Sequence, residues 1–159
     1  MVNKKGIAMV TEIKTQFKFP SEEFFRALVK VTNEALSDKS LGFAVLKMGF
    51  EVIGLDFVKR YVINFDGYEV NYEGETDDFD ILQTEAYVTG QLSVYLDMFK
   101  NIQENSKATG PNTFNALTMA GFPLNIQGKD QVATDKVFRF AETIQQFLDS
   151  AAFLGEIIS

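Results

Sequence analysis

The sequence predicts an α+β domain in which helices pack on the apolar face of one antiparallel sheet. Three observations lead to this prediction. Two alternating segments flank an Asp-Gly turn, three stretches carry apolar residues at helical spacing, and no linker divides the 159 residues. Because the hairpin is antiparallel, a doubly wound parallel sheet is disfavoured. We therefore expect a single domain over residues 1–159.

The first third of the chain predicts a strand, a helix and a second strand. Residues 11–19 alternate between apolar and polar, which is typical of a half-buried strand. Ser21 is a good N-cap for the helix that apolar spacing predicts over residues 22–36. Residues 41–49 fit either a short helix or a turn-rich connector, and the β-branched residues of 50–55 favour a strand.

The clearest local pattern is a hairpin around Asp66-Gly67, a favoured two-residue turn. This turn predicts three facing pairs on one side of the ribbon: Phe65 with Tyr68, Ile63 with Val70, and Tyr61 with Tyr72. The other side carries Val62, Asn64, Glu69 and Asn71. We expect helices to cover the first side and water to contact the second.

The rest of the chain predicts two strands and two helices. Residues 81–88 alternate as a strand, and Thr89 is the expected cap of the helix that follows. A short apolar segment at 114–119 precedes a strand at 122–128. One long amphipathic helix is expected from about 131 to 154, because two apolar lines run along it.

Composition excludes several classes of function. The chain has no Cys and no His, which excludes thiol nucleophiles, disulfides, Ser-His-Asp triads, Cys/His zinc sites and His- or Cys-ligated haem. Its formal charge of −7 disfavours nucleic acid as a partner. We expect no cofactor, and we expect a cytoplasmic protein, since no apolar stretch approaches the roughly 20 residues of a membrane span.

The order of these elements resembles the sterol carrier protein-2 (SCP2-like) superfamily of prokaryotic type. The similar segments are residues 21–36, Asp66-Gly67, residues 88–92, residues 114–119 and residues 124–130. Lys129 separates Gly128 from Asp130, where the family usually has Gly-Asp directly. Residues 21–150 would form the core, and residues 1–20 an N-terminal extension whose extra strand modifies a sheet edge or makes a dimer contact.

The resemblance implies a five-stranded antiparallel sheet with an apolar tunnel beneath its helices. SCP2-like domains bind fatty acyl chains, sterols or isoprenoid lipids, and most catalyse no reaction. Sixteen Phe residues agree with an apolar cavity, although a plain Phe-rich core would also use them. The expected ligand-binding residues are Leu92, Tyr95, Phe99, Phe114, Leu117, Met119, Phe122, Phe138 and Phe147.

Two other functions are compatible with the sequence. Asp78 and Asp80 with Glu85 could serve a carboxylate-based enzyme, although the acidic segment 73–80 is more typical of a solvated turn than of a metal loop. The chain could instead be a homodimeric accessory module of a lipid-modifying or quinone-biosynthesis pathway. Its expected interface combines the 11–19 strand with Phe153-Leu154 and Ile157-Ile158 at the C-terminal end.

Overall fold

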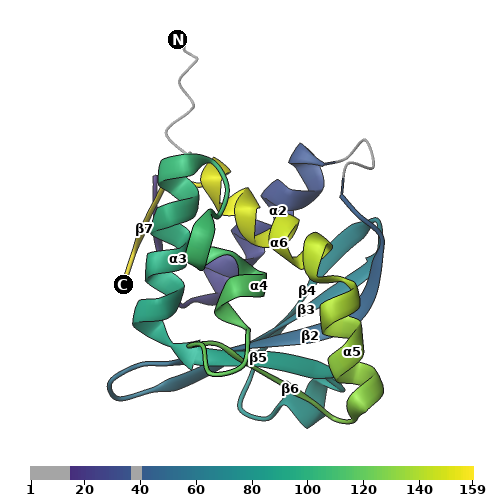
Figure 1. Ribbon diagram of the computed structural model, residues 1–159. Helices are drawn as coiled ribbons and strands as arrows, with labels where there is room; N and C mark the ends of the chain where they lie inside the picture. Colours follow the sequence, from purple (N-terminus) through teal and green to yellow (C-terminus); the bar gives the residue numbers. More distant parts are fainter. Residues whose placement is uncertain (1–14, 37–40) are drawn as a thin grey trace.

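A computed structural model describes residues 15–36 and 41–159. Its main sheet has five strands in the order β4-β3-β2-β5-β6, and the helices lie together on one side of it (Figure 1). The strands are β2 (Ala44–Ile53), β3 (Val58–Gly67), β4 (Glu69–Thr76), β5 (Ala86–Gln91) and β6 (Asn125–Gly128). The predicted α+β class with a five-stranded sheet is confirmed.

The sheet is mixed, so the prediction of a purely antiparallel sheet is wrong at one pair. β2 runs antiparallel to β3 but parallel to β5. After β4 the chain passes through the 3-10 turn η2 (Phe79–Leu82) and re-enters the sheet on the far side of β2. A crossover of this kind brings a strand back in the same direction, whereas a tight hairpin reverses it.

Within the described residues, five helices cover the sheet or follow its edge: α2 (Glu22–Ala35), α3 (Leu92–Asn105), α4 (Phe114–Leu117), α5 (Gln131–Arg139) and α6 (Ala141–Asp149). Helix α2 begins as predicted, because the Ser21 hydroxyl accepts a hydrogen bond of 3.0 Å from the Phe24 amide. Its buried face carries Phe24, Phe25 and Leu28. Two further 3-10 turns, η3 (Gly110–Asn112) and η4 (Ser150–Phe153), precede α4 and follow α6.

Three predicted elements differ from the observed ones. β2 already begins at Ala44, because alternate residues from there to Val52 all enter the core. The strand predicted over 81–88 begins only at Ala86, so Thr89 lies inside β5 and α3 starts after Gln91. The long C-terminal helix is divided at Phe140: α5 packs on β6 and β5, whereas α6 packs on α2 and α4.

The hairpin keeps its predicted faces but not its register. Phe65 pairs with Val70 and Ile63 with Tyr72, so the turn residues are Gly67 and Tyr68. This shift of two residues leaves Ile63, Phe65 and Val70 on their predicted face. The predictions for Tyr68 and for the Tyr61–Tyr72 pair are wrong: Tyr68 is an exposed turn residue, and beyond a β-bulge Tyr61 pairs with Glu75. Ile63, Phe65 and Val70 are buried, whereas Glu69 and Asn71 are exposed and Asn64 is partly exposed.

The outer face of the sheet is covered at one point where water was expected. Val62, predicted to face water, is completely buried. Its strand partner is Gly49, and the ring of Phe79 from η2 lies directly over that glycine: a Cβ atom there would come within 2.4 Å of the ring. The rings of Phe79 and Tyr87 then pack together with centroids 4.6 Å apart. η2 therefore forms a small second apolar cluster behind the sheet.

The two ends of the described chain form a separate ladder. β1 (Gln16–Lys18) pairs in parallel with β7 (Glu156–Ile158). The predicted 11–19 strand is thus present from Gln16 to Lys18, and its first four residues lie outside the described part. Within the described residues no helix is both long and apolar enough to cross a membrane.

Candidate binding cleft

The nine residues predicted to line a tunnel divide into three groups. Tyr95, Phe99, Phe114, Leu117 and Phe147 are buried in the core between sheet and helices. Met119, Phe122 and Phe138 are exposed large side chains on the surface. Leu92, the first residue of α3, is half-buried and lines a cleft.

Aromatic rings fill the sheet–helix interface around the buried group. The ring centroid of Phe99 lies 5.2 Å from that of Phe19 and 5.0 Å from that of Phe24. Phe147 contacts Phe50 and Phe65 in the same way, at 6.1 and 5.6 Å. Edge-to-face and tilted pairs at these distances are favourable packing contacts. Much of the Phe excess noted in the sequence therefore serves the core.

A cleft of about 450 Å³ opens where several elements end. Its apolar wall consists of Phe19, Pro20, Phe57, Tyr61 and Leu92. These residues come from the β1–α2 junction, the β2–β3 connection, β3 and the start of α3, which the fold brings to one end of the sheet. Its polar lining residues are Lys18, Ser21, Glu22, Lys59, Glu75 and Ser159. This volume falls within the range of roughly 300–1,000 Å³ that small-molecule sites occupy.

The charged side chains of the cleft are partly paired with one another. Lys59 lies 3.3 Å from Glu75, and Glu22 lies 3.6 Å from Arg26. Glu22 also accepts a hydrogen bond of 2.7 Å from the hydroxyl of Tyr72. The cleft thus combines an apolar wall with a charge-balanced rim.

Tyr61 is the most buried of the residues with a polar side-chain group that line this cleft. Its side chain is only 1% exposed, and its ring stacks on that of Phe25 with centroids 4.6 Å apart. Burial, with the negative charges of Glu75 and Glu22, raises the pKa of Tyr61 well above its usual value. The hydroxyl therefore stays protonated at neutral pH and is able to donate a hydrogen bond.

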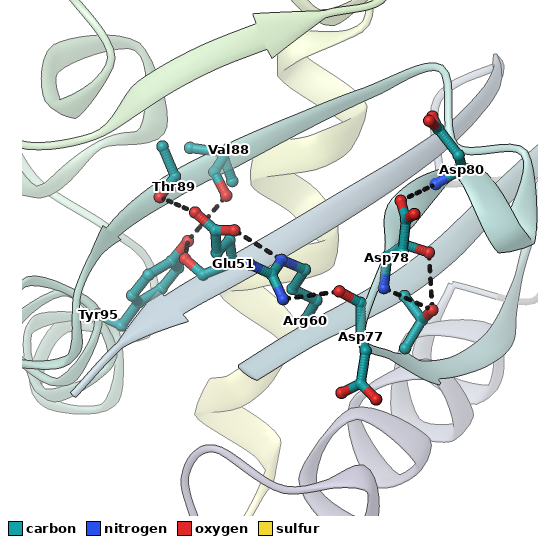
Figure 2. Close-up of polar contacts among 9 residues, drawn as sticks. Glu51, Arg60, Asp77, Asp78, Asp80, Val88, Thr89 and Tyr95 are labelled. Carbon is teal, nitrogen blue, oxygen red and sulfur yellow. Dashed lines mark hydrogen bonds and ion pairs between the residues drawn. The ribbon is translucent and has the colours of Figure 1, made fainter. Parts of the chain in front are cut away.

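A polar cluster next to the cleft has a structural role (Figure 2). Glu51 of β2 accepts hydrogen bonds from Arg60 Nε at 2.8 Å and from Thr89 Oγ1 at 2.6 Å, one on each carboxylate oxygen. The hydroxyl of Tyr95 reaches from α3 to the backbone carbonyls of Glu51 and Val88, at 3.0 and 3.3 Å. These contacts tie β3, β2, β5 and α3 together and occupy both oxygens of Glu51.

Two of the three carboxylates considered for catalysis, Asp78 and Glu85, are engaged in local structure, whereas the Asp80 side chain is exposed. Asp78 Oδ1 accepts from the amide of Asp80 and so caps η2 (Figure 2). Burial alone would raise the pKa of Glu85. Hydrogen bonds from Lys136 Nζ at 2.6 Å and the Lys47 amide at 2.9 Å hold that pKa below its usual value. Among the described residues, no group of acidic side chains could hold a metal ion.

Sequence reasoning identified one residue of this cleft, Leu92. Phe19 was expected on the apolar side of a strand and Tyr61 on the apolar face of the hairpin, and both are buried as that placement requires. Neither pattern shows that the two residues meet at one wall with Phe57. The meeting depends on how the first strand and the β2–β3 connection fold against the sheet.

Comparisons with known proteins find a structural likeness but no sequence match. The sequence matches no protein-family model and no curated protein. A solved structure of a protein named "UbiJ-SCP2 Ubiquinone synthesis protein" covers 81% of this chain and 96% of its own length, at 17% identity and a TM-score of 0.42. Values this low assign no function.

Proposed function

We propose that this chain binds a lipophilic small molecule without transforming it, and that the ligand occupies the cleft beside Leu92. The observation that carries the proposal is the cleft itself, an apolar wall of sufficient volume with a charge-balanced rim. Burying an alkyl chain against such a wall stabilises a complex by roughly 0.8 kcal/mol per methylene before ordering costs.

A non-catalytic role agrees with the placement of the carboxylates. Glu51 and Glu85 have their oxygens occupied by neighbouring side chains and amides, and Asp78 caps a turn. A general acid or base needs an oxygen within reach of a substrate proton. A role as an accessory module beside a lipid-modifying or quinone-biosynthesis enzyme would be one form of the same function. A cytoplasmic location stays a prediction.

The predicted tunnel remains a second proposed position for the ligand. Its residues Tyr95, Phe99, Phe114, Leu117 and Phe147 are buried, although Phe99 and Leu117 also line surface pockets; a ligand would reach Tyr95, Phe114 and Phe147 only if helices and sheet move apart. A homodimer also stays a prediction. The structure pairs β1 with β7 inside one chain, so the two segments expected at a dimer contact bind each other, while Phe153 remains exposed.

The test is a titration with the neutral fluorescent lipophile N-phenyl-1-naphthylamine, together with native mass spectrometry of freshly purified protein. Leu92→Trp narrows the cleft, Leu117→Trp fills the interior, and Leu55→Trp places the same ring on a fully exposed site. We expect the first variant to weaken binding at least fivefold and the third to leave binding unchanged. Circular dichroism melting checks that each variant is folded.

Two results would contradict the proposal. Absence of saturable binding by the wild type, with no lipophile extracted from the purified protein, would remove the binding function. Weakening by Leu117→Trp alone, with the fold intact, would move the ligand from the cleft to the interior.

A further inference from the structure

The hydroxyl of Tyr61 lacks a hydrogen-bond partner among the described residues, although its side chain is buried in the wall of the cleft. Two other tyrosines near it are satisfied. Tyr72 donates to Glu22 at 2.7 Å, and Tyr95 donates to backbone carbonyls. The Tyr61 hydroxyl is not among the buried side-chain atoms without a partner, a group that within the described residues holds only Thr84 Oγ1, so it is accessible from the cleft. This hydroxyl is therefore available to a group that enters the cleft.

The surroundings of Tyr61 determine which kind of acceptor fits. Glu75 is its direct neighbour across the β3–β4 pair, and Glu22 lies in the same cleft. Both carboxylates are near enough to act on the charge state of the phenol. An anionic headgroup bonded to Tyr61 would approach two negative charges, whereas an uncharged oxygen would not. Lys59, which could offset one of them, already pairs with Glu75. Lys18 is the other cation of the cleft lining, so the decanoate arm of the experiment tests its effect directly.

We propose that Tyr61 donates a hydrogen bond to an uncharged carbonyl oxygen of the ligand, and that the cleft takes a neutral lipophile carrying a ketone or ester group. This inference rests on the proposed function and adds a polar anchor to it. The apolar part of the ligand then lies along Phe57 and Leu92, on the same wall as Tyr61. Because the ring is held by Phe25, the hydroxyl has little freedom to lose when it binds.

The experiment uses three ligands that displace N-phenyl-1-naphthylamine. They are decan-2-one, its hydrocarbon analogue 2-methyldec-1-ene, in which a methylene group replaces the oxygen, and decanoate. The variant is Tyr61→Phe, which keeps the stack on Phe25. Its matched control is Tyr87→Phe, whose ring packs on Phe79 on the outer face of the sheet.

We expect the wild type to bind the ketone roughly fivefold more tightly than the hydrocarbon, the effect of one neutral hydrogen bond. Tyr61→Phe should remove this preference without changing the affinity for the hydrocarbon, and Tyr87→Phe should behave as the wild type. At pH values above the pKa of decanoic acid, decanoate should bind more weakly than the ketone. In addition, the carbonyl ¹³C resonance of labelled ketone should move downfield in the wild-type complex and return in Tyr61→Phe.

The outcomes separate this inference from the function on which it rests. If the fluorescent lipophile and the hydrocarbon bind but the ketone shows no preference and no carbonyl shift, the inference is wrong and the binding function stands. The inference is also wrong, and the binding function stands, if decanoate binds more tightly than the ketone. If none of the ligands binds the wild type, both fail. The affinities of the wild type for the ketone and the hydrocarbon test the inference even if Tyr61→Phe does not fold.

Discussion

The sharpest test of the fold is the burial of Val62 on the outer face of the sheet. The alternating pattern places this residue on the face expected to meet water, but the structure leaves it 0% exposed. Val45 offers a matched control. It projects from the same face of the neighbouring strand β2 and is 45% exposed, so Val62→Ala and Val45→Ala are the same chemical change in two environments.

The expected magnitudes follow from burial. Val→Ala removes two methyl groups, which at roughly 0.8 kcal/mol each gives about 1.6 kcal/mol of lost transfer free energy at Val62. A residual cavity adds to this, so a destabilisation of about 2 kcal/mol is expected there. An exposed site away from special contacts changes by about 0.5 kcal/mol or less, which is our expectation for Val45.

Urea denaturation followed by circular dichroism measures both variants. The transition of Val62→Ala should shift to lower urea at an unchanged m value, since the amount of surface exposed on unfolding stays the same. In a domain of this size a loss of about 2 kcal/mol corresponds to a melting temperature lower by roughly 4–8 °C. Equal free energies of unfolding for the two variants would contradict the conclusion that η2 covers Val62.

Three further predictions concern polar contacts, each measured by denaturation. Glu85→Gln should destabilise the protein by about 1–2 kcal/mol at pH 7. Because the pKa of Glu85 is lowered in the folded state, its contribution is present above the unfolded pKa and is lost as pH falls through the folded pKa, so the stabilities of wild type and variant should converge in acid. Burial raises the pKa of Asp149, so ionisation of this carboxyl destabilises the folded state as pH rises. The stability of Asp149→Asn relative to the wild type should therefore increase from pH 3 to pH 7. Asn33 bonds both the amide and the carbonyl of Val70 on the edge strand β4, at 3.0 and 2.8 Å; Asn33→Ala should cost about 1–2 kcal/mol and speed hydrogen exchange at the Val70 amide. A variant that retains wild-type stability at pH 7 would contradict the first or the third prediction, and parallel pH profiles would contradict the second.

Local signals in the sequence predicted the elements whose stability is local. Ser21 caps α2 because a hydroxyl can meet an amide three residues on, and no other part of the chain is needed. The apolar face of the hairpin was also predictable, since alternation with period two survives any shift of two residues. The register was not. Gly67 is the first residue of the observed turn and has φ +79°. A two-residue hairpin turn can place Gly at its first or at its second position, so the sequence fits both the Asp66-Gly67 and the Gly67-Tyr68 register.

The parts that sequence reasoning missed depend on contacts between distant segments. The parallel β2–β5 pair follows from the path of the chain through η2, and no residue pattern in β5 distinguishes it from an antiparallel strand. The break at Phe140 has no Gly or Pro to announce it, because it arises where α5 and α6 pack on different partners. The cleft is of the same kind: Leu92 was expected near a ligand, whereas its meeting with Phe57 and Tyr61 is a tertiary result.

The core and the cleft share two residues, Phe19 and Tyr61, and Phe19 shows how a Phe-rich interior and the proposed site can coexist. The ring of Phe19 lies within 5.0–5.9 Å of the rings of Phe24, Phe25, Tyr95 and Phe99, so it is held from several sides. It also belongs to the wall of the cleft. A wall fixed by the core loses little conformational entropy when a ligand binds, and this favours affinity at a small site. The excess of Phe thus agrees with the proposed function: it packs the interior tightly and fixes the wall of the cleft, which lies beside the Tyr61 hydroxyl, a group without a partner among the described residues.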